Sequence, residues 1–431
     1  GFSVVVALAA ALIVSGPPLL LALAFQGQRA AGIGGADARG WLGRGGRYQQ
    51  AWLGLSNPAR VLLVVLALGA GVFAGEGLKV LSFPYALDYG EAPLLDQTLR
   101  LAHGQNIYRA DLHLPPYTIA NYPPLYMLVQ VPLAWLFGPA FWYGRLLSWL
   151  AMIGAALFVG LILRRLTGDR LAALVGALTL LALPYTRYWG PLYRIDALAL
   201  CLSLAALWVL VRFMPSSESA TSANPALSHD RGGRGARPAL AVVAVALLLT
   251  AAIYTRQSYG LAAPLAAFVW LWSQGLRRQA LLLAGLLAGL GLSLFVLLNL
   301  VTGGGFFFNI VTANINELKV ELLQQYLGEL ATFMPVPVAI AALFALLAGP
   351  ARVRGWRLLL PYTAGAALSG LTIGKVGSNI NYLLEFCAAM SLAVGATLAW
   401  QRRAPRLRHA IMLGLALQLF LLLPGLSYQL F

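Results

Sequence analysis

Two carboxylates, Asp88 and Glu91, stand three residues apart on either side of Gly90, just after an apolar run at 60–81. A solvated loop end at the rim of a membrane would explain them without any function. We favour a second interpretation, in which one of them is a general base that takes a proton from a substrate hydroxyl. Gly90 supports it, because a residue without a side chain lets a ligand come close to the backbone.

Isolated cations form a second set that could do chemistry with an anion. Arg194 and Arg256 each lie in a short segment between apolar runs, and Lys375 lies in a Gly-rich segment at 374–379. A simple ion pair between Arg194 and Asp196 explains these two residues equally well. The candidate substrate-binding residues are Arg194, Asp196, Arg256, Lys375, Tyr122, Asn379, Glu385 and His103.

Glu385 differs from the others because it falls about a turn and a half into an apolar run at 379–400. Ionisable residues inside such runs are functional candidates by default. A structural pair with Lys375 would also account for it. Tyr122 has the competing role of an interfacial anchor.

The segments that must position these residues are hydrophobic. Of the 431 residues 60% are hydrophobic and only 10% are charged, whereas soluble domains carry about 25% charged residues. Runs near 20 residues long suit a bilayer core of about 30 Å. The sequence therefore predicts an all-α polytopic membrane protein. We expect twelve spans: 2–25, 60–81, 141–163, 171–188, 192–212, 238–254, 258–273, 279–301, 331–349, 357–374, 379–400 and 409–427.

The arginines orient these spans. With loop 26–60 inside and the short run 123–138 not crossing, the inner segments hold 21 of the 30 Lys and Arg residues but four of the 14 acids. This is the positive-inside pattern. The net charge of +16 thus reflects topology, and nucleic acid is not expected as a partner, since the arginines do not gather with aromatics on one soluble module.

The chain is expected to form one transmembrane domain over 1–431. An outer-face loop at 82–122 would carry a juxtamembrane helix at 93–103, with His103 among its polar residues, and 302–330 would be a second outer loop. The stretch 214–237, rich in Ser, Ala and Gly, is predicted to be a flexible cytoplasmic linker. Cys201 and Cys387 lie in apolar runs and are expected to pack as inert residues.

The order of these features resembles the GT-C glycosyltransferases. The resemblance rests on acids after an early span, the run Tyr122-Pro123-Pro124-Leu125, Phe137-Gly138 followed by Arg145-Leu146-Leu147-Ser148, and the run 164–170. Over about 60–260 the sequence is similar to glycosyltransferase family 39, which includes the protein mannosyltransferases and the aminoarabinose transferase. Here two residues separate the acids that are usually adjacent, and Asn121 and Tyr122 stand where some members have a lysine.

The resemblance implies that a sugar moves from a polyprenyl-phosphate donor to a lipid, glycan or protein acceptor at the outer face of the cell membrane, with inversion. Asp88 or Glu91 would be the base, with Asp88 preferred. The acids are compatible with a divalent metal but do not specify one. A transporter or flippase is the alternative; it would place charges at mid-membrane on broken helices. A non-catalytic scaffold subunit is a third interpretation.

Overall fold

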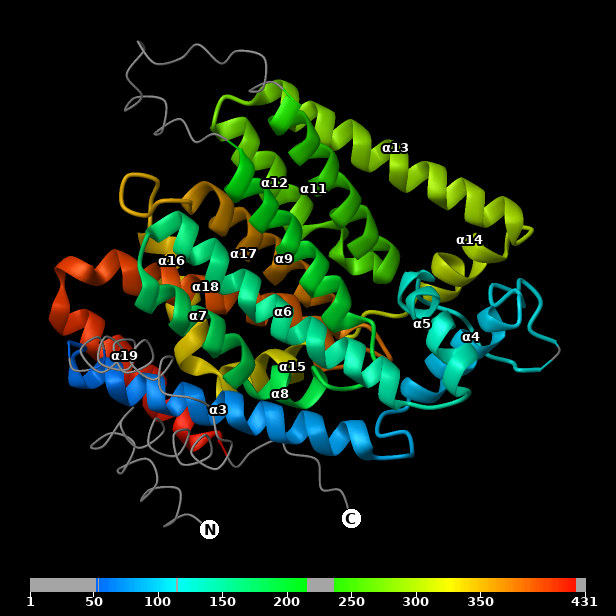
Figure 1. The fold of residues 1–431 in the computed structure, drawn as a ribbon, viewed down its shortest axis with the longest axis horizontal. Coiled ribbons are helices and arrows are strands. Elements are labelled where there is room, and N and C mark those ends of the chain that lie inside the picture. Colours follow the sequence, from blue (N-terminus) through cyan, green and yellow to red (C-terminus); the bar gives the residue numbers. More distant parts are fainter. Residues whose placement is uncertain (1–51, 53, 114, 215–235, 424–431) are drawn as a thin grey trace, which may run out of the picture.

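The structure, a computed structural model, describes residues 52, 54–113, 115–214 and 236–423. The expected span at 2–25, most of the loop 26–60 and nearly all of the linker 214–237 lie outside the described residues. Within them every regular element is helical, apart from one isolated bridge between Leu318 and Lys375. The prediction of an all-helical membrane protein is confirmed (Figure 1).

Six helices in the described residues are long and apolar enough to cross a bilayer. They are α3 (Asn57–Ser82), α6 (Trp142–Thr167), α9 (Asp196–Phe213), α11 (Ala236–Thr255), α13 (Arg277–Val301) and the continuous run η5 (Ile380–Leu383), α18 (Leu384–Trp400) and η6 (Gln401–Arg403). α15 (Val320–Phe333) and α16 (Pro335–Leu347) would add a seventh span, bent by 100°.

The count of twelve spans is not confirmed, because several of the expected spans are broken. Pro184 ends the hydrogen-bonded run that begins in α7 (Arg170–Ala182) and starts the short α8 (Pro184–Trp189). A proline cannot continue a helix from the preceding turn without losing a hydrogen bond. The other short elements are η2 (Gln257–Gly260), α12 (Ala262–Ser273), α17 (Trp356–Gly370), η4 (Leu371–Gly374) and α19 (Pro405–Leu421).

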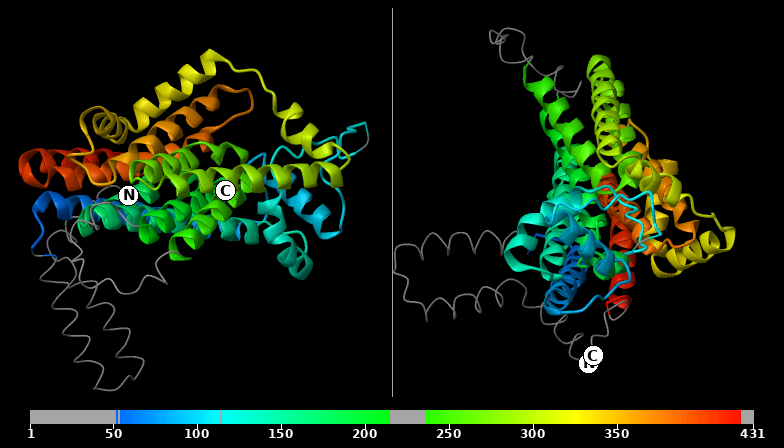
Figure 2. Two further views of the ribbon diagram at one scale, coloured as in Figure 1. Left: turned by 90° about the horizontal axis from the view of Figure 1, so that it is seen from above. Right: turned by 90° about the vertical axis from the view of Figure 1, so that its right-hand side faces the viewer.

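The core is formed around α18, which is almost entirely buried. In contrast, α13 is almost entirely exposed and lies along one side of the molecule (Figures 1 and 2). α6 packs on α7 and α9, and α18 packs on α7. Small residues permit these contacts. A Cβ added to Gly395 would lie 2.8 Å from the carbonyl oxygen of Ala172, so the two backbones already touch.

One end of the long axis carries the short elements that surround the candidate site (Figure 1). The helix expected at 93–103 is α4 (Glu91–Ala102), which packs on α5 (Leu125–Phe137). With 13 residues, α5 is too short to span alone. The segment expected as a loop at 302–330 contains α14 (Gly305–Ile310), η3 (Thr312–Asn314) and most of α15.

Two of the segments expected on the inner side meet at the other end of the molecule. Asp169 caps the N-terminus of α7 and accepts hydrogen bonds from Arg402 Nε at 2.7 Å and Arg408 Nη2 at 3.1 Å. This contact joins the turn between α6 and α7 to η6 and the start of α19. The length of the helices lies between this contact and the candidate site.

Candidate active site

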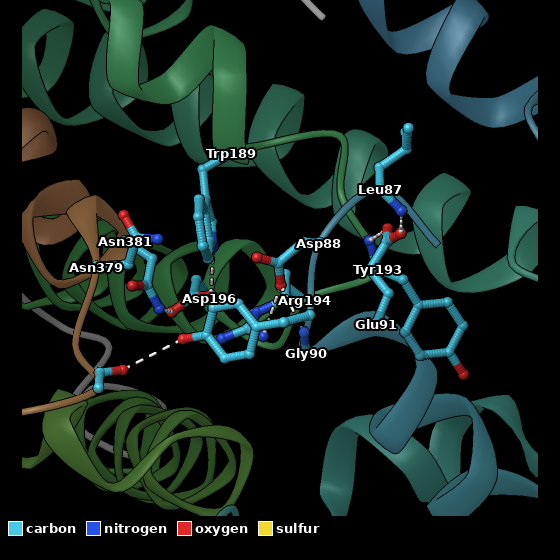
Figure 3. Close-up of polar contacts among 12 residues, drawn as sticks. Leu87, Asp88, Gly90, Glu91, Trp189, Tyr193, Arg194, Asp196, Asn379 and Asn381 are labelled. Carbon is cyan, nitrogen blue, oxygen red and sulfur yellow. Dashed lines mark hydrogen bonds and ion pairs between the residues drawn. The ribbon is translucent and has the colours of Figure 1, made fainter. Parts of the chain in front are cut away.

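Asp88 and Arg194 form the centre of the site. Arg194 Nη1 donates to Asp88 Oδ2 at 2.9 Å, and the Gly90 amide donates to the same oxygen at 2.9 Å (Figure 3). The side chain of Asp88 is 10% exposed and that of Arg194 is 3% exposed. Both described hydrogen bonds fall on Oδ2, and none is described for the other carboxylate oxygen of Asp88.

Gly90 allows this contact. A Cβ at that position would lie 1.4 Å from Arg194 Nη1. The close approach expected from this glycine therefore exists, but the group that approaches is the guanidinium of Arg194.

Glu91 has a different environment from Asp88. It is fully buried, and Arg145 donates to both of its oxygens, Nε to Oε1 at 3.0 Å and Nη2 to Oε2 at 2.7 Å. The amides of Tyr193 and Leu87 each add a bond of 2.7 Å (Figure 3). Four donors occupy the four acceptor positions of a carboxylate. The geometry thus argues against Glu91 as the base, and its contacts hold together the turn that carries Asp88.

Sequence reasoning did not select Arg145 as a site residue. Its guanidinium is fully buried and also donates to the carbonyls of Val80 (2.9 Å), Phe83 (2.5 Å) and Tyr85 (2.6 Å). Val80 lies in the last turn of α3, and Phe83 and Tyr85 follow the end of that helix. A signal was present, since an arginine in the first turn of an apolar span is costly unless it is paired.

Asp196 binds the second arginine. Arg256 forms an ion pair with Asp196 Oδ1. Trp189 Nε1 donates to Asp196 Oδ2 at 2.9 Å, and Asn381 Nδ2 donates to Oδ1 at 3.2 Å (Figure 3). Arg194 Nε lies 3.9 Å from Asp196 Oδ2. The expected Arg194–Asp196 pair is therefore present but long, and Asp196 links the two arginines.

Aromatic rings surround Arg194. Its guanidinium lies 5.6 Å from the ring of Tyr89, 5.9 Å from Tyr122 and 5.2 Å from Trp189, and it donates to the Tyr122 hydroxyl at 3.3 Å. Burial opposes its charge, yet Tyr122 and Asp88 leave the pKa of Arg194 raised above its ordinary value. Burial also raises the pKa of Tyr89, against the effect of Arg194. The arginine is thus held in its charged form.

Glu385 is buried near Arg256 and forms no ion pair with Lys375 in the described structure, so that alternative is wrong. Tyr89 donates to the Gly377 carbonyl at 3.2 Å, which brings the segment of Lys375 and Asn379 beside Asp88. Asn379 caps η5 through the Ile380 amide. His103 is exposed at the end of α4, and its Nδ1 contacts the Leu99 carbonyl, away from this cluster.

Metal ligands do not gather at this site. In the described ranges there is no group of three or more His, Cys, Asp and Glu side chains that could hold a metal ion. Both cysteines are free, and Cys387 is buried. The site as described consists of carboxylates paired with arginines.

The chain is similar to known proteins in sequence over one segment and in structure over most of its length. Residues 121–221, which include Tyr122, Arg145, Arg194 and Asp196, match the family described as dolichyl-phosphate-mannose-protein mannosyltransferase. ArnT from Cupriavidus metallidurans bound to undecaprenyl phosphate superposes with a TM-score of 0.59 over 81% of this chain, at 18% identity. The chain has the GT-C fold.

Two further structures have the same fold. The apo state of the same ArnT gives a TM-score of 0.56 at 17% identity, over 81% of this chain. The apo oligosaccharyltransferase of Archaeoglobus fulgidus gives 0.51 at 14% identity, over 85% of this chain and 56% of its own. The chain spans 62% of the length of the ArnT chains. No curated protein sequence matches it.

Proposed function

We propose that this protein transfers a sugar from a polyprenyl-phosphate-linked donor to an acceptor hydroxyl at the outer face of the cell membrane, with Asp88 as general base. The carrying observation is the position of Asp88. Its carboxylate is bound on one oxygen by Arg194 and the Gly90 amide, and Arg194 also lies 3.9 Å from Asp196, which pairs with Arg256.

The reaction follows from these groups. Asp88 takes the proton of the acceptor hydroxyl as its oxygen attacks the anomeric carbon from the face opposite the phosphate. The bond from that carbon to the phosphate oxygen breaks, and the lipid phosphate leaves with the electron pair. A phosphate is a good leaving group, so cations that stabilise its developing charge suffice and no strong acid is needed. The configuration at the anomeric carbon inverts.

Three cations are candidates to bind that phosphate. Arg194 and Arg256 neutralise Asp88 and Asp196, so this buried group has no net charge of its own. Lys375 makes no ion pair within the described ranges and lies two residues from Gly377, which contacts Tyr89. Its positive charge is the surplus that favours an anionic ligand here. Asn379 and Glu385 follow Lys375 along the chain, at the start of η5 and of α18, and would contact the donor.

The experiment compares the protein with Asp88→Asn in lipid nanodiscs, using a synthetic short-chain polyprenyl-phosphate mannose as the donor and mass spectrometry of both products. Loss of a general base lowers transfer about 10²- to 10⁴-fold. Asp111→Asn, an exposed acid on the 104–122 loop, is the matched control and should keep full activity. Unchanged transfer and hydrolysis by Asp88→Asn, or movement of the donor across the bilayer without covalent change, would overturn the proposal.

A further inference from the structure

The end of the helices opposite Asp88 carries a dense group of arginines. Three segments meet there: the turn between α6 and α7, the loop between α16 and α17, and η6 with the start of α19. Asp169 joins the first segment to the third. Gly355 lies against Leu166, since a Cβ on this glycine would be 2.6 Å from Leu166 Cδ1. Residues 164–170, 350–357 and 401–408 contain ten arginines and one acid, Asp169; we call them the distal arginine group.

The distal arginine group lies where two candidate membrane spans end. α6 carries Arg164 and Arg165 in its last turn, and the run from η5 to η6 ends at Arg403. A helix that just crosses the hydrocarbon core ends at the level of the lipid headgroups. Arginine side chains also extend towards that level while their stems cover apolar surface. The charges therefore lie at the depth of the phosphates of the adjoining leaflet.

Two of these guanidinium groups are held by their inner nitrogen. Arg402 donates from Nε to Asp169 at 2.7 Å, and its side chain is 50% exposed. Arg165 donates from Nε to the Val211 carbonyl at 3.2 Å. In the part of the chain that the structure describes, the terminal nitrogens of both arginines make no hydrogen bond. Each guanidinium is thus fixed in place and keeps the paired donors that match phosphate oxygens.

Most of the positive charge in the group has no acid beside it. Arg164, Arg170, Arg403 and Arg406 are exposed, and among the described residues none of them bonds to a protein group. Like charges at this density repel one another and attract anions. One aspartate cannot neutralise ten arginines, so the distal arginine group favours an anionic partner.

α19 adds an apolar surface that begins at these charges. Arg406, Ala410, Leu413 and Leu417 are spaced by three or four residues, so they share one face of the helix. All four are exposed, Leu417 by 62%. At about 1.5 Å per residue, Leu417 lies roughly 16 Å from Arg406 along the helix. This is close to half of a hydrocarbon core of about 30 Å, the depth that the acyl chains of one leaflet fill.

We propose that the distal arginine group binds anionic phospholipids of the adjoining leaflet, with one lipid lying along α19. Its phosphate would be bound by Arg403 and Arg406, and an acyl chain would cover Leu413 and Leu417. An acidic soluble protein could meet the charges, but it would leave the apolar face of α19 unused. This binding is separate from the reaction at Asp88 and does not depend on it.

The test measures lipid binding to the full chain in a neutral detergent. The protein is titrated with dioleoyl phosphatidylglycerol or with dioleoyl phosphatidylcholine, and native mass spectrometry counts the lipids that stay bound. We expect phosphatidylglycerol to bind at the lower concentration, and added salt to weaken its binding by screening the charges. In Arg403→Gln with Arg406→Gln, its half-saturating concentration should rise about tenfold or more, because each arginine near an anionic surface contributes about fivefold.

Arg277→Gln with Arg278→Gln is the matched control, because it removes the same charge from exposed positions at the start of α13. It should bind phosphatidylglycerol like the unmodified protein. All four substituted side chains are exposed, so both variants should fold, and their Tm values check this. The proposal is overturned if the two lipids bind equally, or if the variant of Arg403 and Arg406 binds phosphatidylglycerol as tightly as the control. Either result would leave these arginines the role of orienting the chain alone.

Discussion

Arg145 binds Glu91 through two hydrogen bonds: its Nε lies 3.0 Å from Oε1 and its Nη2 lies 2.7 Å from Oε2. Both side chains are fully buried. The same guanidinium binds the carbonyls of Val80 near the end of α3 and of Phe83 just after it, and the Glu91 carboxylate binds the amides of Leu87 and Tyr193. The pair thus joins α3, α4, α6 and the segment before α9 behind Asp88. The pair supports the turn that carries Asp88, the proposed base.

Breaking the Arg145–Glu91 pair should lower the free energy of unfolding. Glu91→Gln leaves Arg145 charged and buried without its partner, and the loss of one member of a buried pair costs about 3–5 kcal/mol. We expect a clearly lower Tm in nanodiscs, measured by tryptophan fluorescence. The double variant Glu91→Gln with Arg145→Met should regain part of that loss. A Tm for Glu91→Gln equal to that of the unmodified protein contradicts this assignment.

Gly90→Ala should damage activity more than stability. Its Cβ would occupy the position of Arg194 Nη1, at 1.4 Å, so the guanidinium must move away from Asp88. We expect transfer to fall about tenfold or more, the effect of losing a charge-assisted contact. Gly71→Ala on α3 is the control, because a Cβ there meets nothing within 4 Å. Normal transfer by Gly90→Ala would mean that the Asp88–Arg194 contact is dispensable.

Arg256→Gln should weaken donor binding. It removes a cation from the proposed phosphate site and leaves Asp196, which is fully buried, with a surplus negative charge. Hydrogen bonds to charged groups contribute about 1.5–3 kcal/mol, which corresponds to about a tenfold or larger rise in the KM for the donor. Arg212→Gln, which lies in a predicted inner segment, provides the comparison. Equal KM values of the two variants for the donor would show that Arg256 does not bind the donor phosphate.

Acid should weaken the opposite end of the molecule. Burial alone raises the pKa of Asp169, but hydrogen bonds from Arg402 and the Ala172 amide and the charges of Arg402 and Arg408 lower it overall. Because the folded-state pKa is below the unfolded value of about 3.9, this stabilisation is complete above that pH. It is lost as the pH falls through the folded-state pKa. Tm measured from pH 6 to pH 3 should show this decrease.

Two variants separate the contributions of Asp169. Asp169→Asn keeps an N-cap for α7 but loses the ion pairs, so its Tm should depend less on pH over the same range. Asp169→Ala loses the cap as well, at a further cost of about 0.5–2 kcal/mol. If the pH dependence of Asp169→Asn matches that of the unmodified protein, other acids carry the effect.

The hydrophobic runs and the placement of the arginines determined by themselves that this chain is a helical membrane protein. They also singled out Asp88, Arg194, Asp196 and Arg256, because a charged residue beside or between apolar runs stands out when charges are scarce. Single residues of this kind can be recognised in a sequence because each is unusual for its surroundings.

Only the tertiary structure decided which charge meets which. Asp88 and Glu91 look equivalent along the chain, but α4 begins at Glu91 and carries it into the bundle towards Arg145, 54 residues away, while Asp88 stays in the turn before it. Such pairings depend on how separate helices pack, which local sequence does not specify. The same holds for the break between α7 and α8 within the span expected at 171–188, and for α15, a helix bent by 100° against α16 in a segment that was expected to be a loop.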